Sequence, residues 1–143
     1  MATVELRFSA LPEHVRTARL VAAAVARRAG VDEAVLDEVR LAVGEACSRA
    51  VGLHQSVGIS APVKVMLIEE EKQFSIEVGD EAPHATPGAS NASSAPAEVE
   101  AEEDEMGLAV ISGLVDDVQV SAGEHGGSIK MTWPATPPAV VLP

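Results

Sequence analysis

The histidines and the single cysteine of this sequence are the residues that could support metal or thiol chemistry. The four histidines, at positions 14, 54, 84 and 125, show no paired metal-ligand spacing, so no zinc site is predicted. The single cysteine, Cys47, excludes a disulfide framework and a thiolate zinc site. We expect Cys47 to be a small buried hydrophobe rather than a redox switch. Carboxylates and arginines therefore remain as the candidates for chemistry.

Three of these charged residues stand at positions that suggest a role. Glu45 has Arg49 four residues later, one helical turn along the same face, where the two would form an ion pair. Asp80 ends a strand pattern, a position that suits an ordinary turn residue as well as a ligand contact. Arg19, in an earlier helix pattern, suits either a surface cation or a contact to a partner.

Composition limits the classes of function. The chain has 143 residues, of which 47% are apolar and 2% aromatic, with no Tyr, so it predicts one domain with an aliphatic core and no base-stacking platform. Ten basic against 22 acidic residues give a net charge of −12, which repels nucleic acid and anionic membranes. No apolar run reaches about 18 residues and no leader pattern opens the chain, so we expect a cytoplasmic protein.

The charge is distributed unevenly along the chain. Residues 1–72 hold 10 acidic and 9 basic groups, whereas residues 73–129 hold 12 acidic groups and no Lys or Arg. The stretch 82–97 is rich in Ala, Pro, Ser and Gly and precedes six carboxylates in 98–105. We expect a single domain at 1–134 with a mobile acidic lid loop at 82–105, and an extended Pro-rich tail at 135–143. The acidic run suits a solvated face or, alternatively, a mimic of phosphate.

The elements that must position these residues follow from hydrophobic periodicity. Residues 3–8 alternate as a half-buried strand. A helix begins near Pro12 and ends with Arg27, Arg28 and a C′ Gly30, and Asp32 is a suitable N-cap for a second helix. That second helix carries apolar residues on one face: Leu36, Val39, Val43, Ala46 and Ala50.

The second half of the chain is dominated by strand patterns. Residues 63–68 and 74–78 predict a hairpin joined through 69–72, and 115–121 and 128–133 predict a second pair turned at 125–127. A short helix is expected at 106–114. The order β-α-α-β-β-loop-α-β-β predicts an α/β two-layer sandwich, a mixed and mostly antiparallel sheet covered on one face by helices.

Five short motifs occur in a defined order over residues 4–133: 6–11 (LRFSAL) with 18–19 (AR), 41–46 (LAVGEA), 78–80 (VGD), 106–108 (MGL) with 115–118 (VDDV), and 126–128 (GGS). In order and spacing they resemble those of the anti-sigma factor serine kinases, which belong to the histidine-kinase-like (GHKL, or Bergerat-type) ATPase fold. The resemblance implies that fold for this chain.

The resemblance also implies roles for individual residues. Asp80 would bond the amino group of adenine, and Glu45 would be the catalytic base that activates the nucleophile. Gly107 and Ser128 would lie in the glycine and small-residue boxes that approach the phosphates. Arg19, with Arg16 nearby, would lie on the face that engages a sigma factor and its antagonist.

Departures from the family pattern are concentrated at the phosphate end. Arg49 stands where the family has a Mg²⁺-ligating Asn, and a guanidinium cannot ligate a metal. Ala82 and His84 replace glycines of the first box, and Glu105 replaces one of the second. An ion pair between Glu45 and Arg49 would in addition weaken the base. These degenerate boxes predict poor ATP affinity and no Mg²⁺ site; alternatively, Arg49 itself contacts a phosphate.

The leading hypothesis is therefore a regulatory protein of a partner-switching circuit that binds a sigma factor, an anti-anti-sigma antagonist, or both. A homodimer is implied by the resemblance alone. The alternative is an active serine/threonine protein kinase that phosphorylates its antagonist with ATP. A sensor-kinase fragment is a weaker third hypothesis, because no histidine-bearing dimerisation helix precedes the domain.

Overall fold

The computed structural model describes residues 2–83, 109–115 and 117–136. Most of the expected acidic lid loop and of the Pro-rich tail lies outside these residues, as do His84, Glu105 and Gly107. Within them, five strands form one sheet in the order β1-β2-β3-β5-β4, and every neighbouring pair is antiparallel. The strands are β1 (Ala2–Phe8), β2 (Val63–Glu69), β3 (Gln73–Asp80), β4 (Asp117–Gly123) and β5 (Gly126–Pro134).

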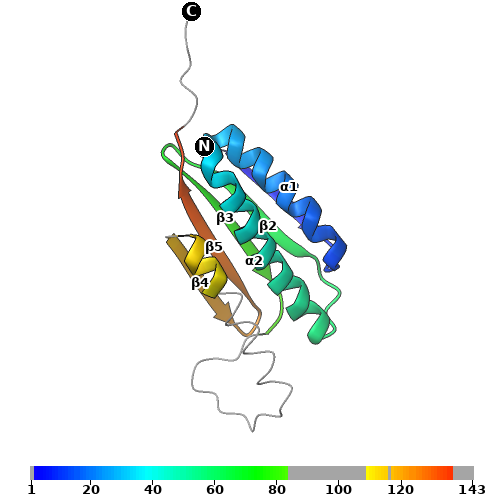
Figure 1. Ribbon diagram of the computed structural model, residues 1–143. Helices are drawn as coiled ribbons and strands as arrows, with labels where there is room; N and C mark the ends of the chain where they lie inside the picture. The colour runs from blue at the N-terminus through cyan, green and yellow to red at the C-terminus, as the bar shows by residue number, and fades with distance from the viewer. Residues whose placement is uncertain (1, 84–108, 116, 137–143) are drawn as a thin grey trace, which may run out of the picture.

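Two long helices lie side by side across one face of this sheet (Figure 1). Helix α1 (Pro12–Ala29) begins with Pro at its first position, where a missing N–H costs nothing, and ends at Gly30 with φ 98°. The Gly30 and Val31 amides donate to the carbonyls of Arg27 and Ala26, which satisfies the last carbonyls of the helix. Both boundaries of α1 agree with the prediction.

Helix α2 (Leu36–Ser56) is reached through a short 3₁₀ turn, η1 (Glu33–Val35). Asp32 caps this turn rather than α2 itself, because its Oδ1 accepts the Ala34 amide at 2.9 Å. The five apolar residues predicted on one face of α2 are all buried. A further helical segment at 109–114 covers the β4–β5 side of the same face, and its Ile111 is fully buried (Figure 1).

The core lies between the helices and the sheet and is built from Val, Ile, Leu and Ala, with Phe74 as its largest fully buried side chain. The opposite face of the sheet carries polar residues at alternate positions. There Glu5 pairs with Lys64, and the hydroxyls of Ser75 and Thr132 bond at 2.9 Å. An antiparallel sheet can be solvated on one face in this way. The predicted two-layer α/β sandwich is therefore confirmed.

One predicted turn is misplaced. The final hairpin turns at Glu124 and His125, not at 125–127, and β4 begins at Asp117 rather than at Val115. Gly123 pairs directly with Gly126, so only two residues remain for the turn. Gly126 opens β5 at φ 136°, a conformation that L side chains rarely adopt.

The small residues of α1 set how closely it can pack. Ala18, Ala22 and Ala26 form a fully buried stripe against α2 and the sheet. We expect Ala22→Leu to lower the free energy of unfolding by about 1–3 kcal/mol, because the added volume has no space to fill. Urea denaturation measures the loss. Leu20→Ala, at a side chain 57% exposed, is the control and should change stability by no more than about 0.5 kcal/mol. An unchanged Ala22→Leu variant would show loose packing at this stripe.

Burial also determines the chemistry of the thiol. Cys47 is fully buried in α2, and desolvation raises its pKa to about 12. At pH 8 roughly one thiol in 10⁴ would then be ionised, and the thiolate is the reactive form. We expect no labelling of the native protein by iodoacetamide over minutes, but complete labelling in guanidinium chloride, as measured by mass spectrometry. Rapid native labelling would contradict the burial of this residue.

Candidate functional site

The C-terminal end of β3 holds a buried ion pair. Nη1 of Arg49, on α2, lies 3.9 Å from Oδ2 of Asp80, and the two side chains are 8% and 1% exposed. The other carboxylate oxygen, Oδ1, accepts the amide of Ala82 at 3.0 Å. Both oxygens of Asp80 therefore have partners within the chain. Removing one member of such a buried pair is destabilising, because the remaining charge loses a partner inside the fold.

His54 holds the residue that follows Asp80. This side chain is fully buried near the end of α2, with Nδ1 2.9 Å from the Ala61 carbonyl and Nε2 2.9 Å from the Glu81 amide. Since Nε2 must accept from an amide, Nδ1 carries the proton and donates to the carbonyl. The histidine thus ties α2 both to the loop before β2 and to the end of β3. From the sequence, His54 was considered only as a metal ligand, and this role was missed.

Gly126, at the start of β5, packs directly against the end of β3. A Cβ at this position would collide with the carbonyl oxygen of Asp80 and come within 3.1 Å of the Glu81 Cα. The small-residue motif 126–128 therefore has a structural function here, since it lets the backbone of β5 approach the end of β3.

The expected ion pair between Glu45 and Arg49 is not formed. Glu45 is exposed, and in the described part of the chain no cation lies within ion-pairing distance of it. Arg49 contacts Asp80 on the sheet side instead. The prediction was wrong because the buried carboxylate of Asp80 competes for the guanidinium, and a pair shielded from water outweighs a solvated i,i+4 pair.

Ser128 does not join the other predicted nucleotide-binding residues. It pairs in register with Gly79, one residue before Asp80. Successive strand residues point to opposite faces, and Ile129 next to it is in the core, so Ser128 lies on the face away from the helices. Asp80, by contrast, lies on the helix side with Arg49. Gly107, the other predicted phosphate-box residue, is outside the described residues.

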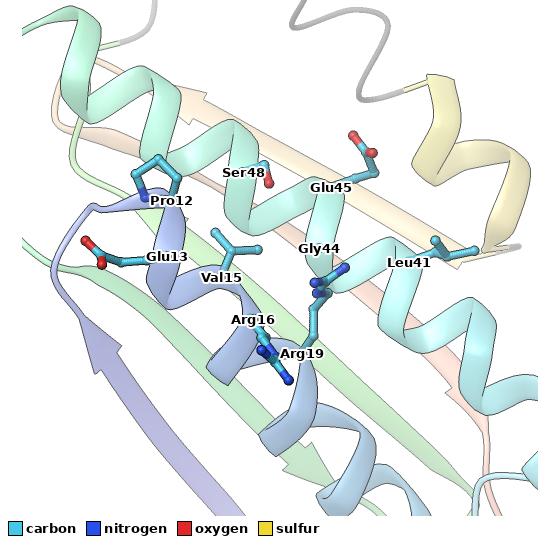
Figure 2. Close-up of a pocket in the computed structure, with 9 residues that line it drawn as sticks. All are labelled: Pro12, Glu13, Val15, Arg16, Arg19, Leu41, Gly44, Glu45 and Ser48. Carbon is cyan, nitrogen blue, oxygen red and sulfur yellow. The ribbon is translucent and has the colours of Figure 1, made fainter.

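A groove on the outer side of the two helices is the second candidate site (Figure 2). It has a volume of about 520 Å³ and is open to solvent. The lining residues come from both helices: Pro12, Glu13, Val15, Arg16, Arg19, Leu41, Gly44, Glu45 and Ser48. It therefore brings the predicted partner-binding arginines, Arg16 and Arg19, together with the predicted base, Glu45.

Gly44 makes this groove possible. The Arg19 side chain extends from α1 over Gly44 of α2 (Figure 2), and a Cβ at Gly44 would lie 2.8 Å from the Arg19 Cδ. The glycine thus lets the stem of Arg19 cross α2 closely while its charged end stays exposed. Gly44 was not singled out from the sequence for this role, although a glycine inside a helix pattern is a signal of close approach.

The two arginines of the groove, Arg16 and Arg19, form no ion pair with another described residue. Five of the seven arginines pair with a carboxylate: Arg7, Arg27, Arg28, Arg40 and Arg49. Among the described residues, no carboxylate pairs with either of the other two, Arg16 and Arg19, and both line the groove. Two guanidiniums with free donors next to the exposed Leu41 suit the binding of a protein surface that carries carboxylates.

The residues at the β3 end do not fit an adenine nucleotide with its metal. Asp80 is covered and paired, Arg49 offers donors where a metal needs acceptors, and Ser128 lies on the other face of the sheet. Over residues 2–83, 109–115 and 117–136, no group of three His, Cys, Asp or Glu side chains is placed to hold a metal ion. Over the same ranges, none of the helices has the length and hydropathy needed to span a bilayer.

Comparisons with known proteins agree with this fold. The sequence profile of the histidine kinase-like ATPase domain matches residues 8–133, so the chain belongs to that family. A solved structure of the RsbU and RsbW domains of Rv1364c from Mycobacterium tuberculosis superimposes with a TM-score of 0.69 at 16% sequence identity. It covers 100% of this chain, which spans 35% of that longer chain. No match is found among curated proteins.

The close approach at Gly126 yields a stability prediction. We expect Gly126→Ala to lower the free energy of unfolding by about 1–3 kcal/mol, because Ala disfavours φ 136° and its Cβ meets the Asp80 carbonyl. Gly123→Ala is the matched control, since its Cβ would make only an ordinary contact at 3.8 Å. Thermal and urea unfolding of both variants measure the difference. Equal losses in the two variants would show that Gly126 is not needed for the β3–β5 approach.

Proposed function

We propose that this chain is a regulatory binding protein of a partner-switching circuit, an anti-sigma-factor-like domain that binds a sigma factor, an anti-anti-sigma protein, or both. The observation that carries the proposal is that Arg16 and Arg19 lie exposed in the α1–α2 groove and form no ion pair with another described residue. In a chain with a net charge of −12, exposed cations that no described carboxylate pairs with suit a carboxylate on another protein.

Two further points support this proposal. The motifs of the first helix resemble those of the anti-sigma factor serine kinases, and the structural neighbour contains a domain named RsbW. Leu41, which lines the groove and is 55% exposed, adds apolar surface beside the charges. We further propose that the protein acts in the cytoplasm as a homodimer, and that its ATP binding and kinase activity are weakened or lost.

An active serine kinase is the second candidate, and one observation favours it. Glu45 is exposed and not paired with Arg49, so its carboxylate is available as a base. The ion pair of Asp80 argues against this candidate, because the residue proposed to hold adenine is already engaged. Incubation with Mg²⁺ and labelled ATP, together with an anti-anti-sigma protein, separates the two candidates. Phosphate transfer that Glu45→Gln abolishes would establish the kinase.

Binding measurements test the leading proposal. Purified sigma factors and anti-anti-sigma proteins from the source organism are each titrated against the chain by calorimetry. A protein that shows saturable binding is taken as the partner. We expect Arg19→Ala to weaken that binding by about 10–100-fold, because a charge-assisted hydrogen bond contributes about 1.5–3 kcal/mol. Arg16→Ala should act in the same direction.

Arg40→Ala is the matched control for these variants. Arg40 is also a helix arginine, but it already pairs with Asp37 at 2.6 Å and does not line the groove. Its loss should change the dissociation constant less than twofold. The proposal fails if no sigma factor or anti-anti-sigma protein binds, or if Arg16→Ala/Arg19→Ala binds as tightly as the wild type.

A further inference from the structure

The end of β3 is fixed by three contacts from two other elements of the fold, α2 and β5. Arg49 of α2 pairs with the Asp80 carboxylate, His54 of α2 accepts the Glu81 amide, and the backbone of β5 at Gly126 lies against the Asp80 carbonyl. Within the segment, Asp80 also accepts the amide of Ala82, whose side chain is fully buried. Three consecutive residues are thus held by independent interactions, all provided by the chain itself.

An adenine ring is recognised through its amino group, which must donate to an acceptor that it can reach. The Asp80 side chain is 1% exposed, so an incoming amino group would have to displace what covers it. In that exchange the neutral amino group of adenine would replace the guanidinium beside Asp80. Arg49, which is itself 8% exposed, would lose a carboxylate partner. An ion pair shielded from water is lost in this exchange and only a neutral contact replaces it, so the exchange is unfavourable.

We propose that Arg49 serves as an internal ligand of Asp80: its guanidinium pairs with the carboxylate that adenine would need and holds the end of β3 in one conformation without nucleotide. Asp80 is then a structural residue in this chain. The fold of the ATPase family is kept, while the conformation of the β3 end no longer depends on ATP. This inference deepens the nucleotide half of the proposed function and requires no partner protein.

Direct titration is the first test. Calorimetry of the wild-type chain with ATP and with ADP, each with Mg²⁺, should show no saturable binding up to millimolar concentration. In hydrogen-exchange measurements, the Glu81 and Ala82 amides should be protected equally with and without nucleotide. Micromolar binding of ATP that Asp80→Asn abolishes would overturn the proposal, because Asp80 would then be an adenine ligand.

A double-mutant cycle is the second test. Arg49→Met and Asp80→Asn should each lower the urea midpoint, and the double variant should lose less than the sum of the two, because both single variants lose the same interaction between the two side chains. Exchange of the Ala82 amide should accelerate in Arg49→Met. The control cycle combines Asp37→Asn with Arg40→Met, an exposed pair on the same helix whose effects should add.

The other outcomes of this cycle also support or contradict the pairing of Arg49 with Asp80. If Arg49→Met alone does not fold, recovery of folding on adding Asp80→Asn supports the pair, and no recovery counts against it. Additive losses at positions 49 and 80 would show that the two side chains do not depend on each other. None of these measurements involves a sigma factor or its antagonist, so failure of the partner-binding proposal would leave this result unaffected, and the reverse is also true.

Discussion

A carboxylate removed from water must be matched by donors, and the arrangement around Asp80 follows from that requirement. Its two oxygens are satisfied by a guanidinium from α2 and by an amide two residues later. These contacts join the end of β3 to α2 and to the residue two positions further along. His54 and Gly126 then complete the same region, one as a neutral hydrogen-bonding bridge and the other by taking up no space.

Much of this fold could be predicted from the sequence because its elements have strong local signals. Pro12 and Gly30 mark the ends of α1, and the apolar stripe of α2 identifies its buried face. The same stripe continues to His54, four residues after Ala50, and a polar residue at a core position could have indicated a buried hydrogen-bonding role. Local patterns placed these residues on the right faces.

The contacts of the site could not be predicted, because they depend on which side chain wins a competition between distant segments. Spacing alone favoured Arg49 beside Glu45, whereas burial placed it beside Asp80, 31 positions further along the chain. The alternation of residues between the two faces of a strand also decided which residues lie near Asp80. Ser128 and Gly127 are adjacent in the sequence, yet they face opposite sides of the sheet, and only the register with β3 decides which one pairs with Asp80.

The arrangement of the strand ends has a consequence for how this unit is attached to other segments. Ala2 pairs with Glu69, and Phe74 pairs with Trp133, so β1 starts and β5 finishes at the same end of the sheet. With strands about 4.8 Å apart, these two points are separated by about 14 Å. Pro12 and Asp80 lie at the far end. Polypeptide joined before Ala2 or after Thr136 would therefore leave from the end of the sheet opposite Pro12 and Asp80.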